Sequence, residues 1–480
     1  MRKIRERKAE MKIINKLASA VLASVISLSA MACFGSAFAE DIDGELTDGT
    51  FKYELVNGSY TIIDCDVTAI MTEIPEMCNG YAITAIGDEA LAGCEYIAEI
   101  KIPSTVKSIG QYAFAGCTGA TKVVIPDSVT EIPVGAFAGC SSLKEVEMGD
   151  GVTTIGARAF YNCPSLETIN IPEGVSVISD YAFHYCYAIK ELDLPSTLES
   201  IGEMAFADCA SIEKITCDDN KVFTVENNVL YNKDKTKLYR ASAHNIDENF
   251  YVPDTVKEIM AGSFSYCTEL TNLYLPASVQ SVGDLAFNFC VALKDIDFSE
   301  GLSSIGNLTF SHCTALESLS LPTTLASIGE ACFWDCAVLE KVILSEGITT
   351  VGPSAFLACP KLNNILVPKS VANVGEQAFG YIVNADGTEY ELKKDFSMSV
   401  YSGSSAEKYA KSADIDCTVV DRSLKHYAFI VIAVGAFILA VVLAVVLMRK
   451  GRKSPDSKKD KDTADDEDSQ PYDSILADDE

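Results

Sequence analysis

The sequence predicts a repeat solenoid of short parallel strands and short helical turns, followed by one C-terminal transmembrane helix. Ala-Phe-Ala-Gly-Cys occurs at 113–117 and again at 136–140, a shift of 23 residues. Four residue columns keep this spacing over most of the chain, and a stretch without charged residues, 427–448, follows them. Self-similarity at a fixed period indicates one stacked array, because a single short unit cannot bury its apolar face alone.

The N-terminal segment 1–39 is predicted to be a secretory signal peptide. A basic stretch precedes an apolar one, and Ala37-Phe38-Ala39 forms a small-x-small cleavage site. The alternative is a lipoprotein signal in which Cys33 carries the lipid. Residues 40–80 are predicted to form an N-terminal cap, because Asn57-Gly58 between two alternating segments favours a β-hairpin.

Residues 81–217 and 252–380 form two blocks of repeats with the pattern L-x-x-I-x-I-P-x-x-V-x-x-I-G-x-x-A-F-x-x-C-x-x. The alternating I-x-I segment predicts a strand with two inward side chains, and Pro ends it. We expect V-x-x-I-G to cross the far side and A-F-x-x-C to form a tight helical turn. The cysteine column is Cys94, Cys117, Cys140, Cys163, Cys186 and Cys209, then Cys267, Cys290, Cys313, Cys336 and Cys359.

The period breaks at residues 218–251, where apolar residues alternate on both sides of Asn232-Lys233-Asp234-Lys235 and predict an inserted hairpin turn. Residues 381–426 are expected to be a C-terminal cap and tether, with a capping box at Ser404 to Glu407.

Residues 427–448 are long enough to span a bilayer, and Arg449, Lys450, Arg452 and Lys453 follow as a stop-transfer cluster. The segment 449–480 is predicted to be a disordered cytoplasmic tail. These ends predict a single-pass protein in the cell membrane, with its bulk outside the cell.

Composition excludes some partners. The chain carries a net charge of −30, which argues against nucleic acid as a partner. The four histidines, His184, His244, His312 and His426, have no metal-ligand spacing. His184 and His312 fall within the repeat turn and are expected to be surface or turn residues. No catalytic or phosphate-binding motif is present, so neither an enzyme nor a cofactor is expected.

The cysteine ladder has three interpretations. Neighbouring rungs lie within disulfide distance, but parallel side chains point the same way, which disfavours pairing. A spacing of 23 residues does not match a zinc motif. Small buried thiols fit best, and some disulfides and metal ligation remain as alternatives. So many free thiols predict export into a reducing or anoxic setting.

The repeat pattern over roughly residues 60–400 resembles the BspA-like leucine-rich repeats, a 23-residue class found in bacterial surface proteins and in some protist ones. The resemblance implies a right-handed solenoid with an extracellular, often adhesive role, in a bacterial protein. It does not identify a ligand.

The outward strand positions vary while the inward ones repeat, as either a recognition face or a merely solvated face would. The candidate ligand-binding residues are Glu99, Lys101, Glu145, Glu147, Glu191, Asp193, Tyr274, Asp295 and Asp297. We expect adhesion to an extracellular protein or glycan. The alternative is a structural spacer, or a receptor whose tail contacts a cytoplasmic partner through Tyr472.

Overall fold

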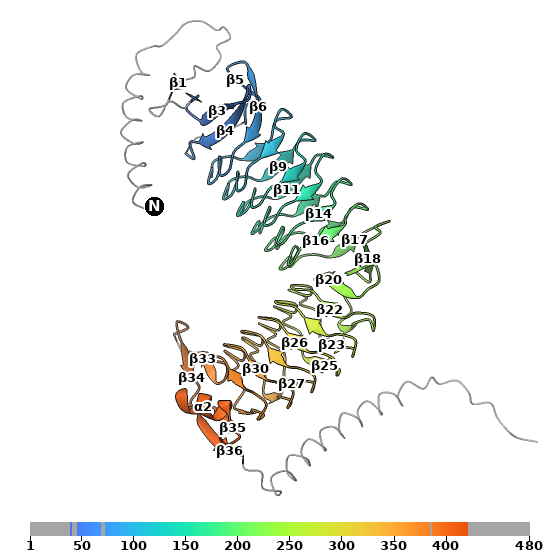
Figure 1. Ribbon diagram of the computed structural model, residues 1–480, viewed down its shortest axis with the longest axis vertical. Coiled ribbons are helices and arrows are strands. Elements are labelled where there is room, and N and C mark those ends of the chain that lie inside the picture. Colours follow the sequence, from blue (N-terminus) through green and yellow to red (C-terminus); the bar gives the residue numbers. More distant parts are fainter. Residues whose placement is uncertain (1–38, 41–45, 69–72, 385, 421–480) are drawn as a thin grey trace, which may run out of the picture. The chain divides into compact units, whose positions relative to one another are not determined.

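The computed structural model describes residues 39–40, 46–68, 73–384 and 386–420. All of these except Val420 belong to one compact unit of the chain, Met1–Val419. Successive turns of the chain stack on one another in this unit (Figure 1).

The unit begins with a cap built mainly from antiparallel strands. Its strands are β1 (Ala39–Glu40), β2 (Leu46–Thr47), β3 (Phe51–Val56), β4 (Ser59–Cys65), β5 (Met77–Cys78) and β6 (Tyr81–Ile86). β3 and β4 pair antiparallel across Asn57 and Gly58, whose φ angles of 52° and 84° are both positive. Positive φ at both central residues is the turn that Asn-Gly favours, so the predicted hairpin is confirmed.

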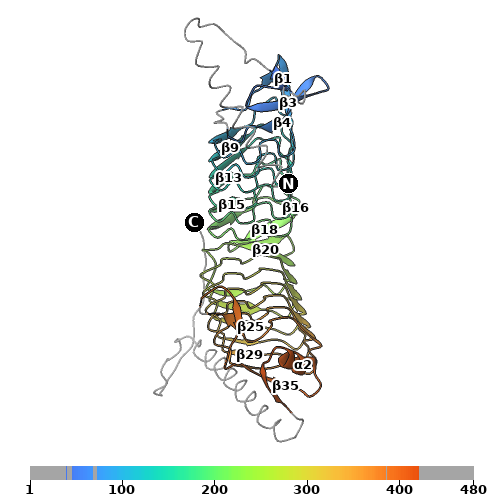
Figure 2. The same cartoon turned by 90° about the vertical axis from the view of Figure 1, so that its left-hand side faces the viewer.

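The I-x-I segments form parallel strands whose outward side chains make one face of the array, here called the strand face. Figure 2 shows such strands from successive repeats beside one another. In block 1 they are β7 (Glu99–Lys101), β9 (Lys122–Ile125), β11 (Glu145–Met148), β13 (Thr168–Asn170), β15 (Glu191–Asp193) and β17 (Lys214–Thr216). In block 2 and the C-terminal cap they are β21 (Asn249–Tyr251), β23 (Asn272–Leu275), β25 (Asp295–Phe298), β27 (Ser318–Ser320), β29 (Lys341–Ile343), β31 (Asn364–Leu366), β35 (Ser397–Val400) and β36 (Asp416–Val419).

Two-residue strands form a second face at the V-x-x-I-G segments. They are β8 (Ser108–Ile109), β10 (Glu131–Ile132), β12 (Thr154–Ile155), β14 (Val177–Ile178) and β16 (Ser200–Ile201), then β22 (Glu258–Ile259), β24 (Ser281–Val282), β26 (Ser304–Ile305), β28 (Ser327–Ile328), β30 (Thr350–Val351) and β32 (Asn373–Val374). The pairing is parallel and keeps one register, as in Ile132 opposite Ile155.

The A-F-x-x-C segments are turns and not helical, which corrects the prediction. Arg158 and Asn162 flank Ala159-Phe160-Tyr161, and both have positive φ angles, 56° and 57°. A left-handed residue on each side stops an α-helix from forming. The backbone instead bonds to the next repeat, as when Phe137 N–H donates to the Ala159 carbonyl at 2.8 Å.

Phenylalanine rings fill the core at every turn. Phe114 to Phe206 form one stacked series and Phe264 to Phe379 another, with neighbouring ring centroids 4.8 to 5.5 Å apart. Except for Phe206, which is 4% exposed, these rings are at most 1% exposed. The repeated Phe is therefore the residue that joins each turn to the next.

Three strands occupy the interruption between the blocks. They are β18 (Phe223–Glu226), β19 (Val229–Asn232) and β20 (Lys237–Ala241), paired antiparallel in that order. The β19–β20 hairpin lies where the sequence predicts one. The additional pairing of β18 with β19 turns at Asn227 and Asn228, both with positive φ, and the sequence analysis did not foresee it.

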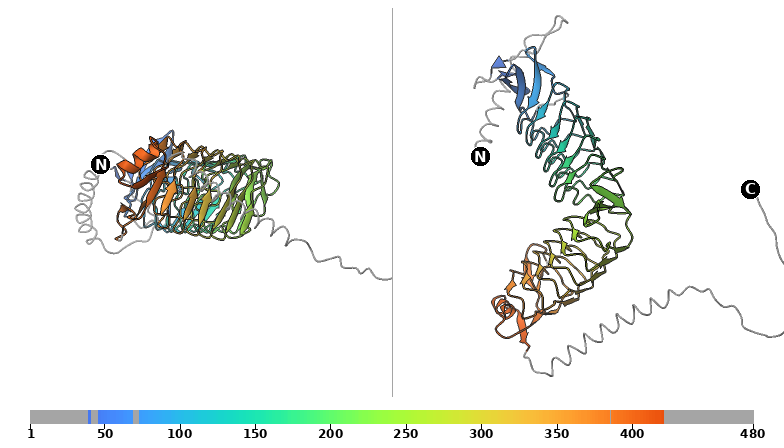
Figure 3. Two further views of the ribbon diagram at one scale, coloured as in Figure 1. Left: turned by 90° about the horizontal axis from the view of Figure 1, so that it is seen from below. Right: turned by 45° about the vertical axis from the view of Figure 1, so that its right-hand side comes forward.

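The C-terminal end carries the one helix of the described residues, α2 (Ser405–Ser412), and the hairpin of β33 (Tyr381–Val383) and β34 (Tyr390–Leu392). Ser404 Oγ accepts from Glu407 N–H at 3.1 Å, and Glu407 Oε2 accepts from Gly403 N–H at 2.6 Å. The predicted capping interaction is confirmed, and α2 lies at the end of the array (Figure 3).

The prediction of a transmembrane helix is also corrected. Within the described ranges, no helix is long and apolar enough to cross a membrane, and α2 is short. The predicted span 427–448, the tail 449–480 and all of the predicted signal peptide except Ala39 lie outside the described residues.

Candidate functional site

The nine candidate residues all lie on the strand face with their side chains at least partly exposed. Alternation along each strand places them there, with a buried residue such as Val146 between Glu145 and Glu147. They do not form one site, because they fall on three separate sheets: β7-β9-β11-β13, β15-β17 and β21-β23-β25.

In the first sheet a lysine neutralises the carboxylates. Lys122 Nζ lies 3.1 Å from Glu145 Oε1 and 2.6 Å from Glu147 Oε1. Hydrogen bonds to Glu147 and then Glu145 raise the pKa of Lys122, and the bond from Lys122 lowers the pKa of Glu147. Glu99 lies in register with Lys122 on the other side. Glu145 and Glu147 are therefore already engaged within the protein.

The second sheet brings Glu191 opposite Lys214 and Asp193 opposite Thr216. The Thr216 hydroxyl donates to Asp193 Oδ1. Glu191 therefore lies beside the positive charge of Lys214, and Asp193 accepts a hydrogen bond from Thr216.

The third sheet carries an aromatic pair beside two carboxylates; we call Tyr251, Tyr274, Asp295 and Asp297 the tyrosine–aspartate patch. The tyrosine rings stack with centroids 4.2 Å apart and planes 3° from parallel. Tyr251 is 63% exposed, and β21 pairs only with β23 in its sheet. Burial, the Tyr251 side chain and the charges of Asp295 and Asp297 raise the pKa of Tyr274. Among the described residues, no cationic side chain forms an ion pair with either aspartate.

Tyr251 is the residue that the sequence analysis missed. The sequence analysis places Tyr251 in the inserted turn 218–251, because it begins the second block of repeats at Val252. It lies one period before Tyr274, directly before Val252-Pro253, and this register could have identified it.

The ladder cysteines are buried, and ten of them carry free thiols. Each of these thiols donates to a main-chain carbonyl of the preceding turn, as Cys163 Sγ does to Phe137 O at 3.2 Å. Burial raises the pKa of Cys117, Cys209 and Cys267 to about 12, so these thiols stay protonated. Cys94, the first rung, instead forms a disulfide with Cys65 of the cap. No metal-binding cluster of His, Cys, Asp or Glu occurs in the part of the chain described here.

The histidines differ in their surroundings. His184 lies in a turn, as expected, but is only 3% exposed and so is not at the surface. His312 is half-buried, with Nδ1 3.0 Å from Asp335 Oδ2. His244 is partly exposed near Glu269, and His426 lies outside the described residues.

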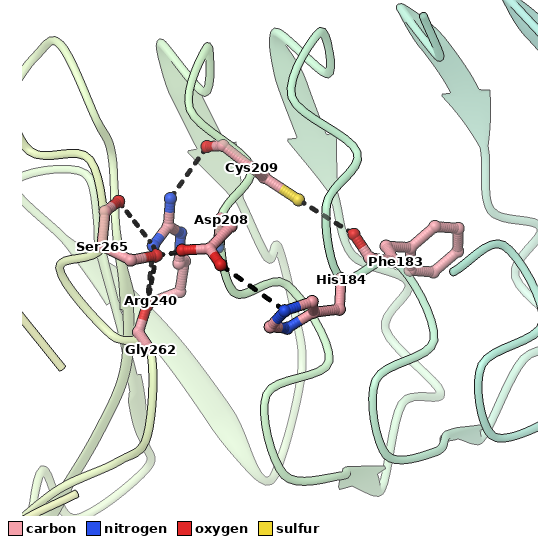
Figure 4. Close-up of polar contacts among 7 residues, drawn as sticks. All are labelled: Phe183, His184, Asp208, Cys209, Arg240, Gly262 and Ser265. Carbon is pink, nitrogen blue, oxygen red and sulfur yellow. Dashed lines mark hydrogen bonds and ion pairs between the residues drawn. The ribbon is translucent and has the colours of Figure 1, made fainter. Parts of the chain in front are cut away.

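His184 belongs to a buried polar group where the two blocks meet (Figure 4). Its Nε2 lies 3.5 Å from Asp208 Oδ2, and Asp208 N–H donates to Ser265 Oγ at 2.7 Å. Arg240, only 1% exposed, donates to the Cys209 and Gly262 carbonyls at 2.8 Å each. Burial lowers the pKa of His184 to about 4, with a smaller contribution from the Arg240 charge, and burial raises the pKa of Asp208.

Comparison with known proteins identifies the repeat. The sequence profile of the BspA type leucine rich repeat region, in six copies, matches residues 72–190, 107–237, 176–259 and 257–385. No curated protein compared with the chain matches it.

Several solved structures are similar. A leucine rich cell surface protein from Faecalibacterium prausnitzii is 28% identical, with 78% of this chain and 99% of that chain covered and a TM-score of 0.58. A leucine-rich repeat protein from Eubacterium ventriosum is 26% identical, covering 69% of this chain and 92% of its own, with a TM-score of 0.52. The pneumococcal vaccine antigen PcpA, 18% identical with 80% and 99% covered and a TM-score of 0.52, shares the fold.

The repeat profile extends over more than half of the chain, and the stacked strands and turns have the geometry that the pattern requires. The chain belongs to the family of BspA-type leucine-rich repeat proteins.

Proposed function

We propose that the chain is a non-catalytic binding protein of the cell surface, which adheres to an extracellular protein through a basic segment of that partner. Membership of the BspA-type family and the likeness to a bacterial cell surface protein support the location. The binding site is the tyrosine–aspartate patch.

The observation that carries this proposal is the contrast between the sheets. Glu145 and Glu147 are held by Lys122, whereas Asp295 and Asp297 have no ion pair among the described residues. A lysine or arginine of a partner can therefore bind the two aspartates without displacing an internal cation. The exposed Tyr251 ring offers a cation–π contact beside them.

The test is binding of the purified full-length chain to a panel of extracellular matrix proteins, glycans and Lys/Arg-rich peptides. The double variant Asp295→Asn and Asp297→Asn should weaken binding of a basic partner roughly 2- to 30-fold, since exposed ion pairs contribute about 0.2–1 kcal/mol each. Tyr251→Ala should weaken it about 2- to 5-fold through the lost cation–π contact. Binding should also fall as salt rises.

The matched control is Glu145→Gln with Glu147→Gln, in the first sheet of the same strand face. It should leave affinity within about twofold because Lys122 already pairs with these carboxylates. Equal losses in both double variants would contradict the proposed site. Binding to glycans alone, insensitive to the aspartate changes, would exclude the basic partner. Failure of every ligand to bind would favour the alternative of a structural spacer.

A further inference from the structure

The apolar core of the array is divided in two. One cluster of buried side chains runs from Phe51 to Leu230, and the other runs from Val229 to Ile415. The two clusters meet at β19, where Val229 and Leu230 belong to different clusters. The stacked phenylalanines divide in the same way, because no ring contact joins Phe206 to Phe264 among the described residues.

No strand of block 1 pairs with a strand on the other side of this division, on either face of the array, among the described residues. On the second face one sheet ends at β16 and the next begins at β18, and on the strand face β15-β17 is separate from β21-β23-β25. In a stacked array, stability is the sum of repeat and nearest-neighbour interface contributions. Where the strand face breaks elsewhere, between β13 and β15 and between β25 and β27, the second face stays paired. Within the described ranges, the interface between the blocks has no strand pairing on either face.

The turn segments of the two blocks nevertheless lie in direct contact. A Cβ placed on Gly262 would lie 2.4 Å from the Ala207 Cβ, so only glycine permits this approach. Between regular repeats the backbone N–H at this turn position donates to a main-chain carbonyl, as Asn162 does to His184 at 2.8 Å. Here Asp208 N–H donates instead to the Ser265 hydroxyl at 2.7 Å.

Arg240, on β20, bridges the two turn segments (Figure 4). It donates to the Cys209 carbonyl on the block 1 side at 2.8 Å, and to the Gly262 carbonyl at 2.8 Å and Ser265 Oγ at 3.0 Å on the other. In regular repeats the cysteine carbonyl accepts within its own turn, as Cys163 O does from Leu166 N–H. The Arg240 guanidinium thus supplies the hydrogen-bond donor that the Cys209 carbonyl would otherwise receive from a backbone N–H.

Other contacts across the division are polar or aromatic. The Tyr187 and Tyr266 rings lie edge to face with centroids 5.8 Å apart, and Phe223 of the first cluster contacts Tyr239 of β20 at 5.3 Å. Ala243 N–H donates to the Ile212 carbonyl at 2.7 Å, and Ser242 Oγ donates to the same oxygen at 2.9 Å. Three buried atoms here, His184 Nδ1, Asp208 Oδ1 and Arg240 Nε, have no protein partner. Buried polar groups that are incompletely paired weaken an interface.

We propose that the array consists of two cooperative units, joined at a polar seam that opens before either unit unfolds, and that Arg240 is the residue that couples them. The seam consists of Asp208, Cys209, Arg240, Gly262 and Ser265. Opening separates Arg240 from the Cys209 carbonyl, and Asp208 N–H from Ser265 Oγ, while both stacked phenylalanine series remain intact.

Native-state hydrogen exchange of the full-length chain at low urea tests this arrangement. In the unaltered protein the amide of Asp208 should exchange through a partial opening, at least about tenfold faster than the block-internal amides of Phe137 and Phe310. Equal rates at all three positions would overturn the proposal without any variant.

Arg240→Met then tests the coupling role, because it keeps an apolar stem but removes the donors. Seam amides should exchange roughly tenfold faster or more, while Phe137 and Phe310 change little. The control Phe137→Leu should instead speed exchange within block 1 and leave block 2 unchanged. If Arg240→Met accelerates exchange evenly through both blocks, Arg240 is an ordinary core residue and the seam is not a separate opening unit.

Discussion

Replacing Phe160 by Leu gives the sharpest test of what holds the repeats together. Phe160 is fully buried, and its ring stacks on Phe137 and on Phe183, each at a centroid distance of 5.3 Å and within 7° of parallel. Each aromatic pair contributes about 0.5–1.5 kcal/mol beyond the buried area. The lost volume adds about 1 kcal/mol, as for a methyl-sized cavity. Phe160→Leu should therefore reduce the free energy of unfolding by about 2–4 kcal/mol.

Phe114→Leu is the matched control. Phe114 is also fully buried, but its ring stacks on Phe137 alone among the described residues, because Leu91 occupies the Phe position of the preceding repeat. It loses one stacked pair, so its cost should be smaller by about 0.5–1.5 kcal/mol. Urea unfolding followed by far-ultraviolet circular dichroism measures both. Equal costs for the two variants, or a cost below about 1 kcal/mol for Phe160→Leu, would refute the stacking argument.

Two further predictions concern the buried titratable groups. The ten free ladder thiols should react with a thiol reagent only after unfolding, because they are buried. Peptide mass spectrometry after a short pulse of reagent checks this, and fast labelling of native Cys163 would contradict it. His184 is held neutral, with its pKa lowered from 6.5 to about 4, so the stability it contributes is present above about pH 6.5 and is lost as the pH falls towards 4. Between pH 7 and pH 4 the unaltered protein should therefore lose about 3 kcal/mol more stability in urea titrations than His184→Gln, and parallel losses would exclude the assignment.

The misplaced features share a cause. A-F-x-x-C has the composition of a helical turn, but stacking favours backbone groups that bond to the next repeat, and the left-handed residues such as Arg158 and Asn162 follow from that. His184 is a polar residue in a turn rich in aromatic residues, and only the polar group around Arg240 explains its burial. The sequence analysis missed Tyr251 because this residue directly follows the break in the 23-residue period.

The sequence by itself determined the period, the inward columns, the two hairpins around Asn57-Gly58 and Asn232–Lys235, and the cap at Ser404. The period and the inward columns repeat every 23 residues, so one unit predicts them. The hairpins and the cap depend on local turn and capping contacts, which short segments predict.

Only the tertiary structure decided which strand-face charges remain available and how the blocks join. Lys122 on β9 forms an ion pair with Glu147, which lies diagonally opposite on the adjacent strand β11. Arg240, which lies outside the repeats, donates to the Cys209 and Gly262 carbonyls. Both contacts depend on side-chain positions that the repeat pattern does not specify. At these positions the molecule differs from a uniform array.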